Sequence, residues 1–518
     1  MLRCGPMNWP PTTMATQHPD NATAPWWKAD GSAFISTQDE IGELITLFSE
    51  LSIDEYMWDW EGKYVDEAVG EKLYAQAAEL LQKRPLGKEI HLTFRIPAFN
   101  GGKMHRMARA FMNILSLSDL AQDIGAPVPP VREMFLPLTV SADQLIKVRQ
   151  AFMQVAEYHR NIFHDGARKH DALLSAVRVT PLVEDIDSMF SIERILQPYW
   201  KVLLEDGVNV QETGLRVFLA RSDPALNSGM VAAVLAIKAA LSKSDELSRE
   251  LGFAVFPIIG TGSLPFRGSV NPKYTEVFLE QYSGVRTYSI QSAFRYDYPK
   301  GEVERALQLI KQEAPKRSVQ HVPEEDRVKL QEMAKIFTSC WGPSIEALES
   351  HINTLAQYTP SRRERLQHIG LFGYCRGVGT VKLPRAIKFT AALYSIGVPP
   401  ELIATGRGLT RVREEGLLPV LDRYYPALRA DLEHAGKYLN RENVELAARK
   451  EKVFQEIKKD IEAIDAYLGT PLGPQQPRHM VHRNLTSTIF HRMQEDPVDA
   501  EAVEHDIVEA ATIRRSLG

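Results

Sequence analysis

Eight short apolar or β-branched runs, separated by longer amphipathic segments, most strongly constrain the fold of this chain of 518 residues. Buried parallel strands read as continuous apolar runs, and consecutive strands need a crossover, usually a helix. Eight such units predict an α/β fold, a (β/α)8 barrel of the TIM type, over residues 14–300. The predicted strands are Thr12–Thr16, Glu55–Trp60, Ile90–Ile96, Val131–Leu138, Leu174–Val183, Leu215–Ala220, Phe253–Ile259 and Arg286–Gln291.

The pattern changes after residue 300, where helical periodicity continues and we find no convincing strand. The predicted helices are Glu302–Glu313, Glu325–Ser339, Ser344–Leu355, Ile387–Ile396 and Asn443–Leu468. The sequence therefore predicts a mostly helical C-terminal domain over residues 301–518. At the other end, residues 1–13 form a short, proline-dotted stretch without the apolar core of a signal peptide, so we expect a disordered leader or an alternative start at Met14.

Composition excludes several classes of function. The formal net charge of −5 and the lack of a long Lys/Arg run argue against a nucleic-acid partner. The three cysteines are too scattered for a disulfide framework or a cysteine zinc site, which favours a reducing, cytoplasmic location. No run of about 18 apolar residues occurs, so we expect no membrane association.

Charged and polar side chains follow most of the predicted strands. In a barrel of this kind, the carboxyl ends of the strands form one rim, where active sites lie. The strand ends carry Gln17–Asn21, Asp59–Glu61, Arg95, Glu184, Arg221–Asp223, Arg267, Gln291 and Arg295. This concentration of acids, bases and guanidinium groups predicts an active site at the rim.

Glu184 and Asp223 end the fifth and sixth strands, which are neighbours in a barrel. Two carboxylates suit Mg²⁺ or Mn²⁺, hard ions that keep water and bind substrate oxygens. Two alternatives stay open from the residues alone. Each acid could pair with an arginine, such as Asp223 with Arg221, and glycosidases also use paired carboxylates.

A glycine-rich loop from Gly260 to Gly268 follows the seventh strand. Gly260 and Gly262 let the backbone approach an anion closely, and Arg267 brings a guanidinium group into the same turn. The loop therefore predicts a site for phosphate or carboxylate. The alternative is a tight turn that carries a surface arginine.

Three further residues are candidates for the site. His18 ends the first strand, and a neutral imidazole at a rim rich in cations could act as a base near pH 7. In the helical half, Arg376 is flanked by glycine and Arg385 follows Pro384 at a helix start. Both arginines could reach over the barrel rim, or they could be ordinary loop and first-turn residues.

Several motifs together resemble the archaeal-type phosphoenolpyruvate carboxylases. The resemblance runs in one consistent order from residue 14 to the end of the chain. It rests on the blocks Met14–Asn21, Ala220–Asn227, Gly260–Gly268, Gln291–Tyr298, Leu383–Ile387 and Pro400–Ile403.

The resemblance implies roles for individual residues. His18 matches a catalytic base, and Glu184 and Asp223 match two metal carboxylates. Matches to the longer type of the family, together with the rim argument, assign the other positions as follows: catalytic Arg267 and Arg376, and substrate-binding Arg221, Gly260, Gly262, Arg295 and Arg385.

The reaction that the resemblance implies is the carboxylation of phosphoenolpyruvate by bicarbonate, giving oxaloacetate and phosphate in anaplerotic CO2 fixation. It implies Mg²⁺ or Mn²⁺ and no biotin, carboxyphosphate and an enolate as intermediates, and a homotetramer. The metal would stabilise the enolate oxygen and the arginines the phosphate in transit.

The chain also departs from the longer type. Thr261 stands where that type has an arginine, and Leu226 stands where it has a lysine. Those two contacts must be absent or supplied elsewhere, and Arg221 is our candidate. Ser516 and Leu517 break the terminal Arg-Asn-Thr-Gly pattern, which argues against aspartate inhibition through the same contacts.

Two other functions are compatible with a barrel of this composition. One is another lyase acting on phosphoenolpyruvate or pyruvate, which would share the metal carboxylates without needing Arg376 and Arg385. The other is a non-catalytic barrel that binds a metabolite. The joint presence of His18, Glu184 and Asp223 argues against the second.

Overall fold

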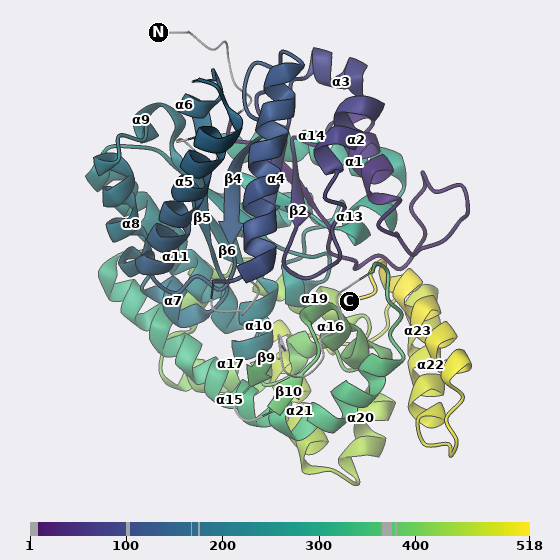
Figure 1. Ribbon diagram of the computed structural model, residues 1–518. Helices are drawn as coiled ribbons and strands as arrows, with labels where there is room; N and C mark the ends of the chain where they lie inside the picture. The colour runs from purple at the N-terminus through teal and green to yellow at the C-terminus, as the bar shows by residue number, and fades with distance from the viewer. Residues whose placement is uncertain (1–8, 100–103, 167, 175–176, 365–375, 379–380) are drawn as a thin grey trace.

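A closed barrel of eight parallel strands forms the first part of the molecule (Figure 1). The computed structural model describes residues 9–99, 104–166, 168–174, 177–364, 376–378 and 381–518. Each strand pairs with the next in the chain, and β1 pairs with β8 to close the barrel. The strands are β1 Thr13–Thr16, β2 Glu55–Asp59, β3 His91–Arg95, β4 Val131–Leu136, β5 Arg178–Val183, β6 Leu215–Ala220, β7 Val255–Gly260 and β8 Thr287–Ile290. The predicted barrel is confirmed.

Helices follow every strand and cover the outside of the barrel. They are α1 Glu40–Ser49, α2 Val69–Gln76, α3 Ala78–Lys83, α4 Met104–Asp123, α5 Ala142–Phe163, α6 Asp171–Leu174, α7 Ile186–Phe190, α8 Glu193–Glu205, α9 Val210–Thr213, α10 Ser222–Ser228, α11 Met230–Leu251, α12 Thr275–Gln281, α13 Ser292–Tyr296 and α14 Lys300–Glu313. The start of the fifth predicted strand was wrong, because Leu174 ends α6 and β5 begins only at Arg178. Helix α14 packs on the barrel's outer hydrophobic cluster through Val303 and Ile310.

Inside the barrel, the side chains form layers, because every second residue of a strand points inward. On β6 these residues are Arg216, Phe218 and Ala220. Phe218 belongs to a buried apolar layer with Met14, Met57, Phe135, Leu182, Ala220 and Ile258. Below it, Arg216 is buried between Glu55 and Glu133, at 2.7 and 2.6 Å. Inward-facing residues on the carboxyl side of the apolar layer therefore face the end of the barrel at which the strands finish.

Residues 9–13 contact the amino end of the barrel. The Trp9 indole N–H donates to the carbonyl oxygen of Thr213 at 2.6 Å, and the Arg178 guanidinium lies 4.6 Å from the Trp9 ring centroid. The Thr12 hydroxyl donates to Asp54 at 2.9 Å. The predicted disordered leader is therefore wrong for this stretch, since Trp9 covers the buried charge layer.

The second part of the molecule is mostly helical. Its helices are α15 Glu324–Gln357, α16 Ala386–Ser395, α17 Thr405–Glu414, α18 Leu418–Tyr424, α19 Leu428–Gly436, α20 Arg441–Ala448, α21 Lys452–Leu468, α22 Pro477–Arg492 and α23 Ala500–Arg514. A small antiparallel hairpin, β9 Arg376–Val378 with β10 Val381–Leu383, corrects the expectation of a part without strands. Three-residue strands are too short to leave a periodic signal.

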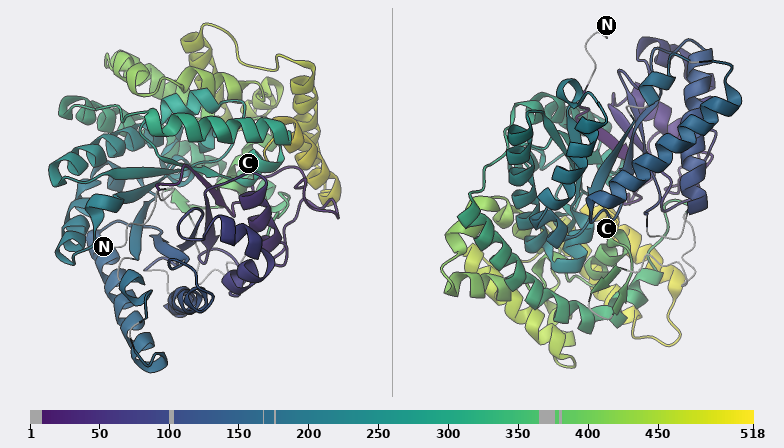
Figure 2. Two further views of the ribbon diagram at one scale, coloured as in Figure 1. Left: turned by 90° about the horizontal axis from the view of Figure 1, so that it is seen from above. Right: turned by 60° about the vertical axis from the view of Figure 1, so that its left-hand side comes forward.

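The helical part lies at the carboxyl end of the barrel, below the strands in Figure 1 and in the right-hand view of Figure 2. Helices α10 and α11 of the barrel share one hydrophobic cluster with α15 and α16, through residues such as Leu226, Val234, Trp341 and Phe389.

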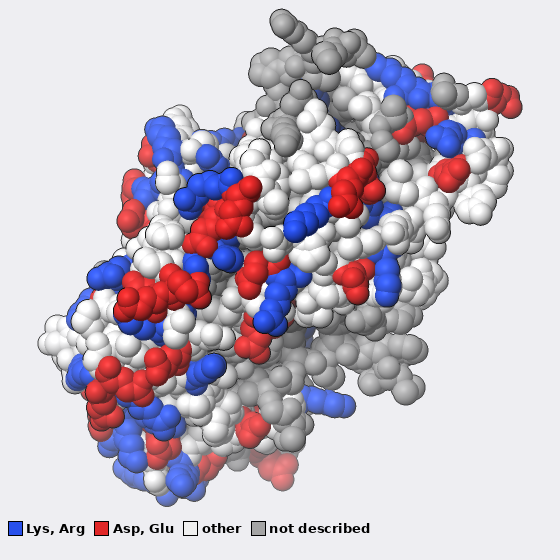
Figure 3. All heavy atoms as spheres, turned by 90° about the vertical axis from the view of Figure 1, so that its left-hand side faces the viewer, with Lys and Arg blue, Asp and Glu red and all other residues white. Residues whose placement is uncertain are grey.

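Within the described ranges, every helix is too short or too polar to span a bilayer. On the face drawn in Figure 3, acidic and basic side chains are interspersed.

Candidate active site

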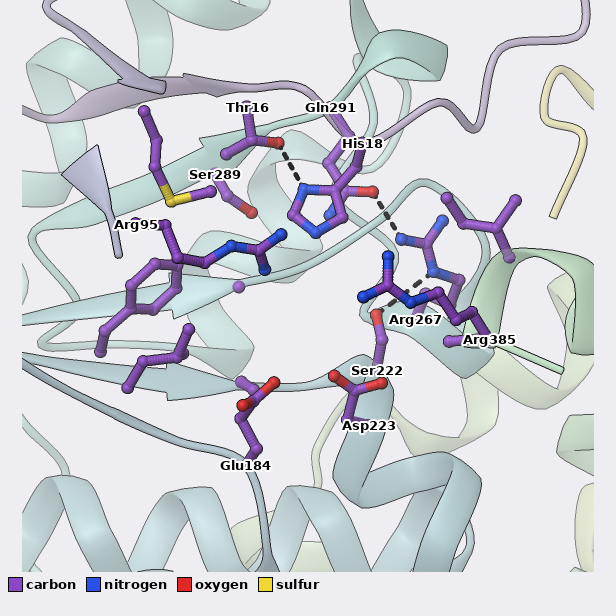
Figure 4. Close-up of a pocket in the computed structure, with 17 residues that line it drawn as sticks. Thr16, His18, Arg95, Glu184, Ser222, Asp223, Arg267, Ser289, Gln291 and Arg385 are labelled. Atoms are coloured by element: carbon purple, nitrogen blue, oxygen red, sulfur yellow. Dashed lines mark hydrogen bonds between the residues drawn. The ribbon is translucent and has the colours of Figure 1, made fainter. Parts of the chain in front are cut away.

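One pocket lies where the barrel's carboxyl end meets the helical part (Figure 4). Its walls come from strands β1 to β3 and β5 to β8, from the glycine-rich loop and from the start of α16. The lining residues are Thr16, His18, Met57, Arg95, Leu182, Glu184, Phe218, Ala220, Ser222, Asp223, Gly260, Arg267, Ser289, Gln291, Arg385, Ala386 and Ile387. Six of the ten predicted site residues are therefore brought together: His18, Glu184, Asp223, Gly260, Arg267 and Arg385.

The two predicted metal carboxylates lie side by side on one wall of the pocket (Figure 4). Glu184 directly follows β5, and its Oε2 accepts a hydrogen bond from the backbone N–H of Leu138 at 2.8 Å. Asp223 lies in the first turn of α10, directly after β6. Both side chains point into the same space, which is the arrangement that a shared divalent ion requires.

His18 faces these carboxylates from the opposite wall (Figure 4). Its Nδ1 lies 2.9 Å from the hydroxyl oxygen of Thr16. When the ring proton is on Nδ1 and is donated to Thr16, the lone pair is on Nε2. The Thr16 contact thus orients the ring for use as a base, and Thr16 is a site residue that the sequence reasoning missed.

Arg267 is buried and held by hydrogen bonds on three sides. Its Nε donates to the Ser222 hydroxyl at 3.2 Å, and Nη1 donates to Asp20 at 3.0 Å and to the Gly518 oxygen at 2.6 Å. Its Nη2 donates to Gln291 at 2.5 Å. Burial lowers the pKa of Arg267, and the carboxylates of Asp20 and Asp223 oppose that shift. The guanidinium group is thus fixed at the pocket wall.

The glycines of this loop leave room for its close packing. A Cβ on Gly262 would lie 2.7 Å from the Arg267 guanidinium carbon, and one on Gly260 would lie 2.9 Å from the Phe218 ring. Gly268 has φ +117°, a conformation that L side chains rarely adopt. The predicted role of the two glycines changes accordingly: Gly260 lines the pocket, while Gly262 makes space for Arg267.

Arg385 confirms the expectation that the helical part reaches over the barrel rim. It directly precedes α16 and lines the pocket beside Arg267 (Figure 4). A Cβ on Gly62 would lie 2.8 Å from Arg385 Nη1, so a side chain at this position in the loop after β2 would displace the Arg385 guanidinium group. Gly62 was not singled out by the sequence.

Arg95 also lines the pocket, although it was predicted only as a charged strand end. Its guanidinium forms a two-point ion pair with Asp59, with Nε donating at 3.0 Å and Nη2 at 2.5 Å. Burial alone would raise the pKa of Asp59, but Arg95 outweighs it and holds that pKa well below its ordinary value. The alternation of side chains along β3 could have indicated this position. Thr93 faces the barrel interior, where its hydroxyl donates to Glu55, and Arg95 is two residues further on and so faces the same way.

Arg221 does not line the pocket, so its predicted contact with substrate is not supported. It follows the inward-facing Ala220 and therefore points outward. Its guanidinium donates to the Tyr282 hydroxyl at 3.2 Å and to the carbonyl oxygens of Phe266 and Pro265 at 3.0 and 3.3 Å. Arg221 thus holds the turn that carries Arg267.

Arg295 is likewise buried away from the pocket. Its Nη2 lies 3.0 Å from Glu43 Oε1, and Nη1 donates to the carbonyl oxygens of Thr16 and Ile290. Glu43 is shared with Arg363, whose Nη2 lies 2.6 Å from the same oxygen. Arg295 therefore links β1 and β8 to α1, and the prediction that it binds substrate is not supported.

Two remaining predictions concern the end of the chain and the hairpin. Arg376 lies in β9, but its side chain and most of the preceding segment are outside the described residues. The end of the chain is docked: Leu517 is buried and its N–H donates to the Asp20 carbonyl oxygen at 2.7 Å. Gly518 thereby reaches Arg267.

This chain is similar to known proteins over nearly its whole length. The family model described as phosphoenolpyruvate carboxylase matches residues 11–518. A phosphoenolpyruvate carboxylase from Metallosphaera sedula is 37% identical over 519 residues, covering 98% of this chain and 99% of the relative. One from Oenococcus oeni is 35% identical over 481 residues, covering 92% and 94%. One from Caldivirga maquilingensis is 36% identical over 525 residues, covering 98% and 99%.

Proposed function

The chain belongs to the phosphoenolpyruvate carboxylase family, and we propose on that premise that its pocket converts phosphoenolpyruvate and bicarbonate to oxaloacetate and phosphate. The observation that carries this assignment is that one pocket contains both carboxylates and guanidinium groups. Two carboxylates, Glu184 and Asp223, lie on one wall, and the guanidinium groups of Arg95, Arg267 and Arg385 lie around them. A trianionic substrate that also binds a divalent ion needs both kinds of group.

The donor set on the carboxylate wall fits Mg²⁺ or Mn²⁺. Glu184 and Asp223 offer hard oxygen ligands, and two protein carboxylates are typical for Mg²⁺, which keeps several waters or substrate oxygens. When bound there, the ion supplies Lewis-acid stabilisation of negative charge on substrate oxygens. We propose Glu184 and Asp223 as its ligands.

The arginines bind and orient the substrate. Arg267 is preorganised by Ser222, Asp20 and Gln291, so it needs no rearrangement when negative charge develops on the transferred phosphoryl group. Arg385 comes from the helical part and meets the substrate beside Arg267. In the reaction, a bicarbonate oxygen attacks phosphorus and the bond from phosphorus to the enol oxygen breaks. The products of this step are carboxyphosphate and the enolate of pyruvate.

His18 acts in the next step. Its Nε2 accepts the proton from carboxyphosphate while Thr16 holds Nδ1. The carbon–oxygen bond to phosphate then breaks, which releases CO2 and phosphate, and the enolate carbon attacks CO2 to form oxaloacetate. Loss of the proton drives CO2 release inside the pocket, next to the enolate.

The remaining features of the proposal are those that the family resemblance implies. We propose that the enzyme works without biotin, that it assembles as a homotetramer and that it acts in the cytoplasm. Arg376 is proposed as a further phosphate contact, because it lies in the hairpin β9–β10 that leads directly to Arg385.

The deciding experiment measures phosphoenolpyruvate consumption coupled to the reduction of oxaloacetate, with and without bicarbonate. We expect oxaloacetate only when both bicarbonate and Mg²⁺ or Mn²⁺ are present. Consumption of phosphoenolpyruvate with no oxaloacetate, or with no need for bicarbonate, would indicate another barrel lyase. No consumption under any condition would favour a non-catalytic barrel.

A further inference from the structure

Two histidines and an aspartate form a compact cluster away from the pocket. Asp119 lies in the last turns of α4, His159 lies in α5, and His164 directly follows α5. Their ligand atoms all lie within 4.8 Å of one another. Both helices run back from the rim that carries the pocket (Figure 1), so the cluster lies toward the opposite, amino end of the barrel.

The spacing within the cluster suits a single metal ion. Asp119 offers one oxygen to each ring: Oδ1 lies 3.0 Å from His164 Nε2 and Oδ2 lies 3.4 Å from His159 Nε2. Ligands of a tetrahedral ion with bonds of about 2.0–2.1 Å lie about 3.4 Å apart. The two separations from Asp119 are close to this value, and the ligand atoms of all three residues lie within 4.8 Å of one another, so small movements of the side chains would let them share one ion.

His164 shows that an ordinary hydrogen-bond network does not explain the cluster. Its side chain is only 3% exposed, yet neither ring nitrogen has a hydrogen-bond partner among the described residues. Nε2 is 3.0 Å from Asp119 Oδ1 without hydrogen-bond geometry. A buried polar atom in this state costs free energy unless something satisfies it. A cation between the ring and the carboxylate would satisfy both.

The surroundings supply the support that a metal-bound histidine needs. Asp171 Oδ1 lies 3.7 Å from His164 Nδ1, and its Oδ2 accepts the backbone N–H of Arg168 at 2.8 Å. Ligating histidines usually offer their second ring N–H to such a carboxylate. The Arg168 guanidinium lies 3.5 Å from Asp119 and 3.2 Å from Asp123, so it balances the acids from outside the cluster.

We propose that Asp119, His159 and His164 bind one divalent transition-metal ion of the zinc class, which fastens the ends of α4 and α5 together. Imidazole ligands favour Zn²⁺ over Mg²⁺ or Ca²⁺, so this ion differs in kind from one held by the pocket carboxylates. Water completes the coordination. The role is in binding and stability, and it does not depend on the proposed reaction.

The test is a titration of the chelator-stripped, full-length protein with Zn²⁺ alone, followed by calorimetry and by the thermal unfolding midpoint. We expect one tight site per chain and a rise in the midpoint. Asp119→Asn should weaken binding roughly a hundredfold or more, and Asp171→Asn roughly 10- to 100-fold. Two control variants should bind Zn²⁺ as tightly as the unchanged protein. Asp223→Asn removes a pocket carboxylate, and His505→Asn removes an exposed histidine from the second cluster, formed by His505, Asp506 and Glu509.

Cobalt provides a second readout. Co²⁺ bound by two histidines in tetrahedral geometry should show strong visible absorption, which octahedral Co²⁺ on carboxylates lacks. Asp119 is about one-quarter exposed, so Asp119→Asn should fold, and circular dichroism checks this. Tight binding that survives Asp119→Asn, binding lost in either control, or the lack of a stoichiometric site would overturn the proposal.

Discussion

Replacing Arg267 by lysine tests whether the guanidinium fork, rather than charge alone, drives phosphoryl transfer. Arginine has five N–H donors, and hydrogen bonds among the described residues use four of them, to Ser222, Asp20, Gly518 and Gln291. We propose that the fifth, on Nη2, donates to the substrate. A lysine ammonium is a single flexible point charge, and it cannot contact Ser222 and Gln291 at once while also presenting a donor to the pocket.

The size of the effect follows from this loss of one preorganised donor. Removing such a donor costs about 2.7–4 kcal/mol of transition-state stabilisation, or roughly a hundred- to a thousandfold in kcat. Lysine keeps a cation beside the buried Asp20, so stability should fall less than in Arg267→Met. That variant leaves the carboxylate unpaired, and breaking a buried pair costs about 3–5 kcal/mol.

The assay measures kcat at saturating phosphoenolpyruvate, bicarbonate and Mg²⁺, together with thermal unfolding. Arg249→Lys serves as the matched control, because Arg249 is exposed and its ion pair with Asp245 lies on the surface of α11. We expect the control to keep its activity. A well-folded Arg267→Lys enzyme with kcat within a few-fold of the unchanged protein would refute the reasoning, and Arg267 would then be only a structural residue of the loop.

Four further changes test other parts of the site and fold. His18→Asn should abolish oxaloacetate formation but leave slow, bicarbonate-dependent release of phosphate and pyruvate; near-normal oxaloacetate formation would exclude His18 as the base. Asp223→Asn should sharply raise the Mg²⁺ concentration for half-maximal rate, and an unchanged requirement would remove Asp223 from the metal site. Gly62→Ala would place a Cβ 2.8 Å from Arg385 Nη1 and should raise KM for phosphoenolpyruvate without lowering the unfolding midpoint; an unchanged KM would contradict the assigned contact. Burial raises the pKa of Asp297 from 3.8 to about 7, so the folded state binds the proton more tightly and this group makes stability fall as pH rises from about 4 to about 7. Asp297→Asn should flatten that part of the stability profile relative to the unchanged protein, and identical slopes in denaturant titrations would refute it.

The barrel could be predicted because its signal is repeated. Eight apolar runs at crossover spacing leave few other topologies, and single errors at strand ends do not alter the count. The start of β5 was missed because Leu174, which looked like the first apolar residue of the strand, is the last residue of the short helix α6. The hairpin β9–β10 was missed because strands of three residues are too short to leave a periodic signal.

The site was predicted only in part, because charge at a strand end does not say which way a side chain points. Side chains alternate between the two faces of a strand, so the direction of one residue is known when a neighbour on the same strand is known to face the barrel interior. Arg95 points inward with Thr93, and Arg221 points outward because Ala220 points inward. Applying this rule to every strand end would have placed Arg95, rather than Arg221, among the predicted pocket residues. The contact between Gly62 and Arg385 joins segments more than 300 residues apart, so no local pattern could reveal it.

The helical part does more than cover the pocket, because it holds the loop that carries Arg267. The backbone N–H of Phe266 donates to Glu401 at 2.7 Å, and the Ser269 hydroxyl donates to Asp431 at 2.5 Å. Ser269 has φ +59°, a strained conformation for a residue with a side chain, which persists only where surrounding contacts enforce it. Arg221 holds the same turn from the barrel side. The position of Arg267 thus depends on both parts of the chain, and a barrel without its helical part would lose Arg385 and would also release the loop that fixes Arg267.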